Sequence, residues 1–475
     1  MAAEPIPVPT QTEQAIANEQ GLARQLTERQ LSMIAIGGAI GTGLFLGSAL
    51  AVRTAGPGVI LSYIFTSVIA LLLMFCLSEM AVAHPTAGSF GVYADLYLSP
   101  WAGFVVRFTY WAAQSIAAGG EAVAAAIYTK WWFPNTPTWI WVVIYSALLI
   151  YVNARSVAAF GSFEYWFSTI KVTAIGVFIV LGAGILLGFR QQRPIGLANY
   201  TAHGGFLPHG WTGVWLALAF VIFAFIGTEI VAVTAGEAKD PERSVPRAMR
   251  TMLLRLVIFY VGAITVLVGT VPWNQIEPGQ SITVSPFVRV FELMRVPIAA
   301  DIVNFVVLTA ALSGMNCCLY LSTRMIFSLA RGGYAPPSLG RVSERGTPIP
   351  ALLFSAGGLG VAVALSFLFP SSAYVYMFGI ALFGGLFVWL MIFITHLSFR
   401  KHWVAQCGRK LPVRMPLFPV TTILGGALVL AIIISTWWVE GMRVTLESGI
   451  PWLLFLSAVH VVWARTGREG IDRGK

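Results

Sequence analysis

About twelve long apolar segments, separated by short polar connections, constrain how this chain can fold. A helix that spans a lipid bilayer needs about 20 predominantly apolar residues, and backbone polar groups inside the bilayer must be satisfied within the segment. We therefore predict an all-α polytopic membrane protein with about 12 transmembrane helices. The segments lie near residues 30–52, 57–82, 101–128, 138–158, 164–188, 213–236, 250–271, 286–330, 350–370, 373–398, 417–438 and 444–464.

The polar residues are too few to cover a soluble protein of this length. Of 475 residues, 57% are hydrophobic and 11% are charged, whereas soluble domains are about 25% charged. This balance excludes a soluble enzyme of several domains and a disordered chain. The net charge of +10 does not indicate a nucleic-acid partner, because such binding requires basic residues gathered on one exposed face. The expected surroundings are instead the lipid bilayer.

Basic residues predict how the chain is oriented. With the N-terminus in the cytoplasm, about 20 Lys and Arg fall on the inner side, against about 7 on the outer side. We therefore predict a multi-pass protein of the cytoplasmic (plasma) membrane with both termini inside. The first apolar run begins only near residue 31, after an acidic and polar start, so we expect no signal peptide.

Metal, disulfide and cofactor chemistry have no clear signal in the sequence. Its 4 cysteines show no CxxC spacing and set no disulfide framework. No histidine pair has metal-ligand spacing, and the glycine-rich stretches lack the Lys-Ser/Thr of a P-loop. We expect no enzyme activity, no metal and no resident cofactor.

Two of the apolar segments are interrupted by glycine. The first contains five glycines within residues 37–47, and each weakens a helix by about 1 kcal/mol relative to alanine. The tripeptide Ile-Gly-Thr at 40–42 recurs in the sixth segment at 226–228. Interrupted segments at matching places in two halves are typical of transporters built from inverted repeats.

Such interruptions create a binding site by exposing backbone groups. A broken helix presents N–H groups at the start of its second half and C=O groups at the end of its first. The N–H end suits a carboxylate and the C=O end an ammonium, so two adjoining breaks can hold a zwitterionic amino acid. The alternative is that the glycines only let helices pack, since Gly37 and Gly41, and Gly43 and Gly47, form small-xxx-small pairs.

Several motifs occur in register between residues 27 and 400. They are the glycine-rich run 37–48 and the segments 77–81, 163–172, 225–229 and 322–325. As a set they resemble the first, second, fifth, sixth and eighth helices of the amino acid transporter family, within the amino acid–polyamine–organocation superfamily.

The resemblance implies a LeuT-like core of two inverted five-helix repeats plus two C-terminal helices. It also implies secondary uptake of an amino acid, usually with protons. The expected parts are a cytoplasmic tail at 1–26, repeats at 27–190 and 205–400, two peripheral helices at 415–465 and a cytoplasmic tail at 466–475.

By the same resemblance, the first interruption would hold the backbone of the substrate. Thr42 and Gly43 would bind its carboxylate, and the carbonyls of Ala39 and Ile40 would face its amine. Gly41, between them, belongs to the expected substrate-binding set.

The sixth segment would supply the wall of the pocket. Phe223 and Ile226 lie beside its interruption, with Phe223 at the place of an aromatic gate, and Gly227 lies within the interruption. This apolar lining favours a neutral or aromatic side chain.

Ionisable residues at membrane depth are costly and need a reason. Lys171, about seven residues into the fifth segment, is a candidate for proton coupling, because a desolvated amine can exchange a proton near neutral pH. The resemblance to the family implies that it lies near the first interruption, where sodium-coupled relatives bind sodium. The alternatives are an ammonium fixed by first-helix carbonyls and a lysine that snorkels to the membrane surface.

Two carboxylates complete the candidate set for proton coupling or relay. Glu121 lies in the middle of the third segment, where it either lines the pocket or relays a proton, or else serves only in helix packing. Glu229 follows the sixth interruption, and we expect it to accept backbone N–H bonds there, with direct proton handling as the alternative. Glu79 is expected to be structural or gating, and Arg107 to pair with an acidic residue such as Asp95.

Together these features predict a secondary active transporter that imports an amino acid by proton symport with alternating access. Exchange, sodium coupling and a membrane sensor without transport stay open as alternatives, whereas a pore-type channel lacks a filter motif. A carboxylate such as Glu121 could also favour a cationic substrate. The sequence does not indicate the oligomeric state.

Overall fold

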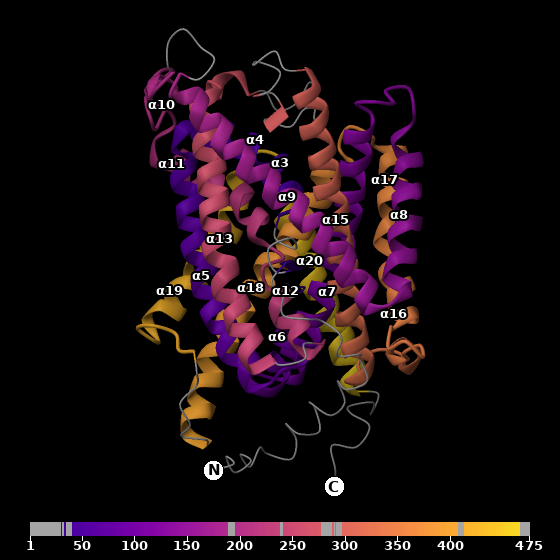
Figure 1. Ribbon diagram of the computed structural model, residues 1–475. Coiled ribbons are helices and arrows are strands. Elements are labelled where there is room, and N and C mark those ends of the chain that lie inside the picture. Colours follow the sequence, from indigo (N-terminus) through magenta and orange to yellow (C-terminus); the bar gives the residue numbers. More distant parts are fainter. Residues whose placement is uncertain are drawn as a thin grey trace.

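The computed structural model describes residues 40–188, 195–237, 241–276, 297–406 and 413–465, with the isolated positions 30, 33, 34, 287, 288 and 290. Within these residues every regular element is a helix. Long helices run alongside one another between two ends of the molecule, with α10 at one end and α6 at the other (Figure 1). The predicted all-α class is confirmed. The predicted tails at 1–26 and 466–475 lie outside the described residues.

The first half of the chain contains α3 (Thr42–Phe45), α4 (Gly47–Ala55), η1 (Gly56–Gly58), α5 (Val59–Ala83), α6 (Ser89–Tyr97), α7 (Pro100–Thr129), α8 (Thr138–Arg155), α9 (Val157–Leu186) and α10 (Ala198–Thr201). The second half contains α11 (Gly210–Val221), η2 (Ile222–Phe225), α12 (Ile230–Val233), η3 (Thr234–Glu237), α13 (Pro241–Thr270), η4 (Trp273–Gln275), α15 (Pro297–Arg331), η5 (Pro337–Gly340), α16 (Ile349–Ser355), α17 (Gly357–Leu368) and α18 (Ala373–Gln406). The last elements are α19 (Val420–Ser435), η6 (Thr436–Trp438) and α20 (Arg443–Arg465).

Nine stretches of the described chain are long and apolar enough to cross a membrane. One of them, Gly47–Ala83, covers parts of the first two predicted segments. Helices α7 and α13 correspond to the two remaining segments. Polar residues lower the average hydropathy of α7, whereas the apolar stretch of α13, Val257–Thr270, is shorter than the nine. The chain is therefore a polytopic membrane protein with about 12 spanning helices.

The boundary between the fourth and fifth segments differs from the prediction. Helix α8 ends at Arg155 and α9 begins at Val157, because the side chain of Ser156 caps α9 by accepting the backbone N–H of Ala159. The predicted start near residue 164 was therefore wrong by about two turns. Lys171 consequently lies much deeper in the helix than predicted.

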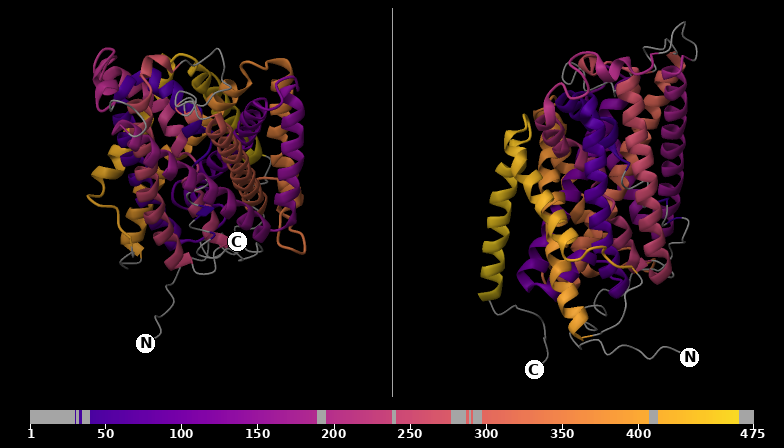
Figure 2. Two further views of the ribbon diagram at one scale, coloured as in Figure 1. Left: turned by 45° about the horizontal axis from the view of Figure 1, so that its top comes forward. Right: turned by 90° about the vertical axis from the view of Figure 1, so that its left-hand side faces the viewer.

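The bundle has a buried centre and a lipid-exposed flank. In the most apolar part of α18, 83% of residues are buried, whereas in α20 the share is 17%. Helices α19 and α20 each pack against α18, with α19 also beside α5 and α20 also beside α7, and both lie at the edge of the bundle in Figure 2. This arrangement agrees with two peripheral helices, although the division into two inverted repeats stays a prediction.

The interruption of the sixth segment is confirmed. Helix α11 passes into the 3-10 turn η2, and an irregular stretch separates η2 from α12, which begins at Ile230. Gly227 in that stretch has φ +107°, a conformation that residues with a β-carbon rarely adopt. The first segment is described from Ile40 onward, with α3 beginning at Thr42 and α4 at Gly47. Both copies of Ile-Gly-Thr therefore lie at helix irregularities.

Candidate functional site

A small cavity of about 30 Å³ lies where the two interrupted segments meet α7, α15 and α18. Its walls contain six of the predicted site residues: Gly41, Gly43, Glu121, Phe223, Ile226 and Gly227. The remaining wall residues are Ala113, Gln114, Ala117, Gly314, Cys317, Cys318, Leu321 and Ala381. Sequence segments that are far apart thus converge on one pocket. Ala39 lies outside the described residues.

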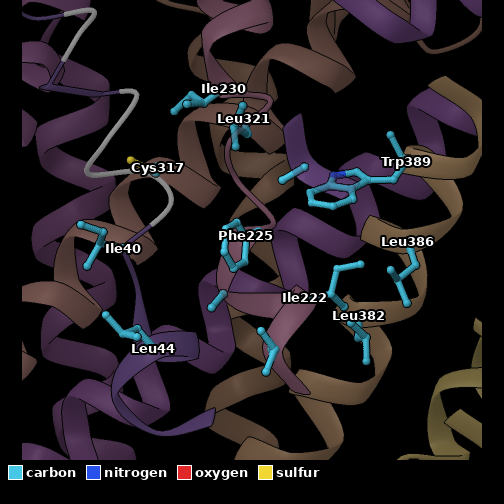
Figure 3. Packing of buried hydrophobic residues seen from close by; sticks show 14 of the residues in the cluster. Ile40, Leu44, Ile222, Phe225, Ile230, Cys317, Leu321, Leu382, Leu386 and Trp389 are labelled. Carbon is cyan, nitrogen blue, oxygen red and sulfur yellow. The ribbon is translucent and has the colours of Figure 1, made fainter. Parts of the chain in front are cut away.

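Close packing of the two interruptions shapes this cavity. A β-carbon on Gly43 would lie 2.8 Å from the Cα of Ala224 and 3.1 Å from the ring of Phe223, so glycine is required there for the backbones to approach. The centroid of the Phe223 ring lies 4.0 Å from the centroid of the Phe378 ring. Ile40 and Leu44 of the first segment and Ile222 and Phe225 of the sixth lie in the surrounding core (Figure 3).

The Glu121 carboxylate accepts hydrogen bonds from Thr42 at the first interruption. Its carboxylate accepts the backbone N–H of Thr42 at 3.2 and 3.4 Å and the Thr42 hydroxyl at 3.0 Å. The hydroxyl of Tyr374 in turn donates to Thr42 Oγ1 at 3.2 Å. Of the two residues expected to hold a substrate carboxylate, Thr42 and Gly43, Thr42 therefore donates to a carboxylate of the protein.

The glycines of the first segment and of α15 enclose the Glu121 carboxylate tightly. A β-carbon on Gly41 would lie 2.6 Å from Glu121 Oε1, and one on Gly314 would lie 2.8 Å from Glu121 Cδ. Ion pairs between described residues do not include Glu121. A buried carboxylate in such a place depends on its hydrogen-bond donors.

Glu229 holds the second interruption. It accepts the backbone N–H of Gly227 at 3.1 Å with each oxygen, as the sequence predicted. Tyr110 on α7 donates to it at 2.7 Å, and Trp389 on α18 at 3.3 Å. Four hydrogen bonds from three residues therefore fix this carboxylate and the irregular backbone beside it.

Lys171 is fully buried against the first interruption. Its ammonium donates to the carbonyl of Ile40 at 2.8 Å and to Ser313 Oγ at 2.7 Å. This contact agrees with an ammonium held by a first-helix carbonyl, and burial excludes the snorkelling alternative. It also gives the Ile40 carbonyl a partner other than the predicted substrate amine.

Glu164 is the counter-charge that the sequence interpretation missed. Its Oε1 lies 3.8 Å from Lys171 Nζ, and the Ser313 hydroxyl donates to the same oxygen. Ser168 donates at 3.2 Å, and Asn316 donates to the other oxygen at 3.3 Å. Glu164 and Lys171 are seven residues apart and therefore share one face of α9. This spacing was a usable signal, hidden by the helix start predicted at 164.

Two further carboxylates, Asp95 on α6 and Glu79 on α5, pair with basic side chains. Arg107 binds Asp95 at 2.8 Å, which confirms the predicted partner. Glu79 pairs with His396 at 2.9 Å and with Arg400 at 3.4 Å. Burial lowers the pKa of His84, in the connection after α5, to about 4, so this side chain is neutral. These contacts tie helix ends together away from the cavity.

The chemistry of the cavity is that of binding. The described residues contain no group of three or more His, Cys, Asp or Glu arranged to hold a metal ion. Backbone donors, small residues and isolated buried charges surround the cavity instead.

Comparison with known proteins connects this chain to one family. Residues 30–471 match the amino acid permease family model. An uncharacterized amino acid permease of Bacillus subtilis is 39% identical, covering 93% of this chain and 95% of the relative. A γ-aminobutyric acid permease of Bacillus subtilis is 38% identical over 90% of each chain. An aromatic amino acid transport protein of Salmonella typhimurium is 37% identical over 94% of this chain and 97% of the relative. Over nearly its whole length, therefore, this chain belongs to the amino acid permeases, a family of membrane transporters and not of enzymes.

Proposed function

We propose that this protein imports an amino acid across the cytoplasmic membrane by proton symport with alternating access. The observation that carries the proposal is the convergence of two interrupted segments on one cavity, with Glu121 and Lys171 buried beside it. Charges at membrane depth are costly to bury, and in membrane proteins they mark substrate pathways and proton relays. Phe223 against Phe378 is the expected aromatic gate.

The expected substrate has a neutral side chain. Apart from Glu121, the cavity is lined mostly by alanine, glycine and apolar residues, with Gln114 as a polar contact. Glu121 is the single charged residue among the described lining residues, and its carboxylate is hydrogen-bonded to Thr42. The relatives named for γ-aminobutyric acid and for aromatic amino acids define the first compounds to try.

Transport in proteoliposomes tests this function. With an alkaline interior, a panel of labelled amino acids should show accumulation of at least one compound, and a protonophore should abolish it. Exchange with preloaded substrate but no accumulation would favour an exchanger. Saturable binding without any flux would favour a sensor and refute the proposal.

Orientation forms part of the proposal. The bias of basic residues predicts that both termini, and the C-terminal ends of α5 and α18, lie in the cytoplasm. A fluorescent reporter that folds only in the cytoplasm, fused after Lys475, should be bright. A dark reporter, together with an active periplasmic phosphatase fused at the same place, would contradict the proposed orientation and show that the C-terminus lies outside.

A further inference from the structure

We infer that Glu121 is an internal substitute for the substrate carboxylate, which must displace it from Thr42 to bind. This inference rests on the proposed function and adds a coupling step to it. The same donors, the N–H and hydroxyl of Thr42, serve Glu121 and were expected to serve the substrate.

Competition follows from the lack of room. Gly41 and Gly314 enclose the Glu121 carboxylate so closely that one additional carbon on either would touch it. A second carboxylate therefore cannot share the Thr42 donors while Glu121 occupies them. The contact also joins residues 79 positions apart, so α7 and the first segment can separate there without breaking a local turn.

The charges around Glu121 decide what happens after displacement. Lys171 on α9 is the nearest ammonium acting on it, but that group already donates to Ile40 and Ser313 and pairs with Glu164. The other titratable groups that face Glu121 are the hydroxyls of Tyr128 on α7 and Tyr374 on α18, and the thiol of Cys318 on α15. None of these adds a positive charge.

A displaced Glu121 carboxylate would thus be buried without its donors. An unpaired buried carboxylate takes up a proton instead of staying charged. One proton from the solution that admits the substrate would therefore bind to Glu121 for each substrate carboxylate that binds to Thr42. When the substrate leaves on the other side, Glu121 returns to Thr42 and releases the proton there.

Proton uptake on binding tests this step directly. The purified full-length protein in detergent would receive a mixture of the standard L-amino acids with γ-aminobutyrate, in weak buffer with a pH indicator. The wild type should take up about one proton per bound substrate, and its affinity should fall about tenfold per pH unit on the alkaline side. Glu121→Gln should bind without proton uptake and with little dependence on pH, and it should lose accumulation driven by a pH gradient.

Two control variants make the result decisive. Glu447→Gln removes an exposed carboxylate on α20 and should retain proton uptake per bound substrate. Glu121→Asp keeps the charge and should retain proton uptake even if Glu121→Gln does not fold. Persistent proton uptake in a folded Glu121→Gln, or loss of its binding at every pH, would overturn the inference. Failure of the wild type to bind any compound would instead overturn the proposed function.

Discussion

In the first interrupted segment the backbone N–H of Thr42 donates to Glu121, 79 residues away, whereas in the sixth the N–H of Gly227 donates to Glu229, two residues away. The first contact can break by moving one helix relative to another. The second is local and is reinforced by Tyr110 and Trp389. The comparison indicates that the Glu121 contact in the first segment can be replaced by another ligand, whereas the Glu229 contact fixes the backbone of the sixth segment.

The largest expected effect is at Lys171, which fixes the backbone just before the first interruption. Lys171→Ala leaves Glu164 buried without its counter-charge, which costs about 3–5 kcal/mol. Thermal unfolding in detergent measures this loss. Where protein can be recovered, accumulation driven by a pH gradient should be abolished.

A double variant separates charge balance from coupling at this site. Lys171→Met combined with Glu164→Gln removes both charges and should recover most of the lost stability without recovering accumulation. Unchanged accumulation by Lys171→Ala in proteoliposomes would show that this lysine only stabilises the structure and takes no part in proton coupling.

The second prediction concerns the carboxylate of the fixed interruption. Glu229→Ala leaves three buried donor groups, on Gly227, Tyr110 and Trp389, without their acceptor. At the lower bound of about 1 kcal/mol for each unsatisfied group, the free energy of unfolding should fall by about 3 kcal/mol. If this variant unfolded at the same temperature as the wild type, the Glu229 contact in the sixth segment would be as replaceable as the Glu121 contact in the first.

The third prediction compares one glycine from each interruption, Gly41 in the first segment and Gly227 in the sixth. Gly227→Ala must adopt φ near +107°, which costs about 1–3 kcal/mol. Gly41→Ala instead places a methyl group against a side-chain oxygen of Glu121, which can move away. We therefore expect Gly227→Ala to lower the unfolding temperature more, and Gly41→Ala to change the pH dependence of substrate binding more. The reverse order would contradict the comparison.

The sequence predicts local features of this molecule better than distant contacts. Hydropathy reveals the spanning helices, the repeated Ile-Gly-Thr reveals the interruptions, and the short spacing from Gly227 to Glu229 reveals their hydrogen bond. Ser313 lies 142 residues from Lys171, so its bridging position depends on how α9 packs against α15. No pattern in a single sequence records that packing.

The same limit explains the different outcome at Glu121. Its depth in the membrane marks it as a candidate, because any charge there needs a reason. The sequence does not reveal that this carboxylate reaches the Thr42 donors, since that contact depends on the register of α7 against the first segment. Prediction from the sequence thus identified the residue but not its partner.

The smallest expected effect comes from two tyrosines that play similar parts at the two interruptions. Tyr110 donates directly to the Glu229 carboxylate at 2.7 Å, whereas Tyr374 donates to the Thr42 hydroxyl at 3.2 Å. Hydrogen bonds to charged groups contribute about 1.5–3 kcal/mol and neutral ones about 0.5–1.5 kcal/mol. Tyr374→Phe should therefore lower the free energy of unfolding by less than Tyr110→Phe does, as thermal unfolding of the two variants side by side would measure. An equal or larger loss for Tyr374→Phe would mean that the first interruption is held as firmly as the second, and Glu121 could then not be displaced by a substrate.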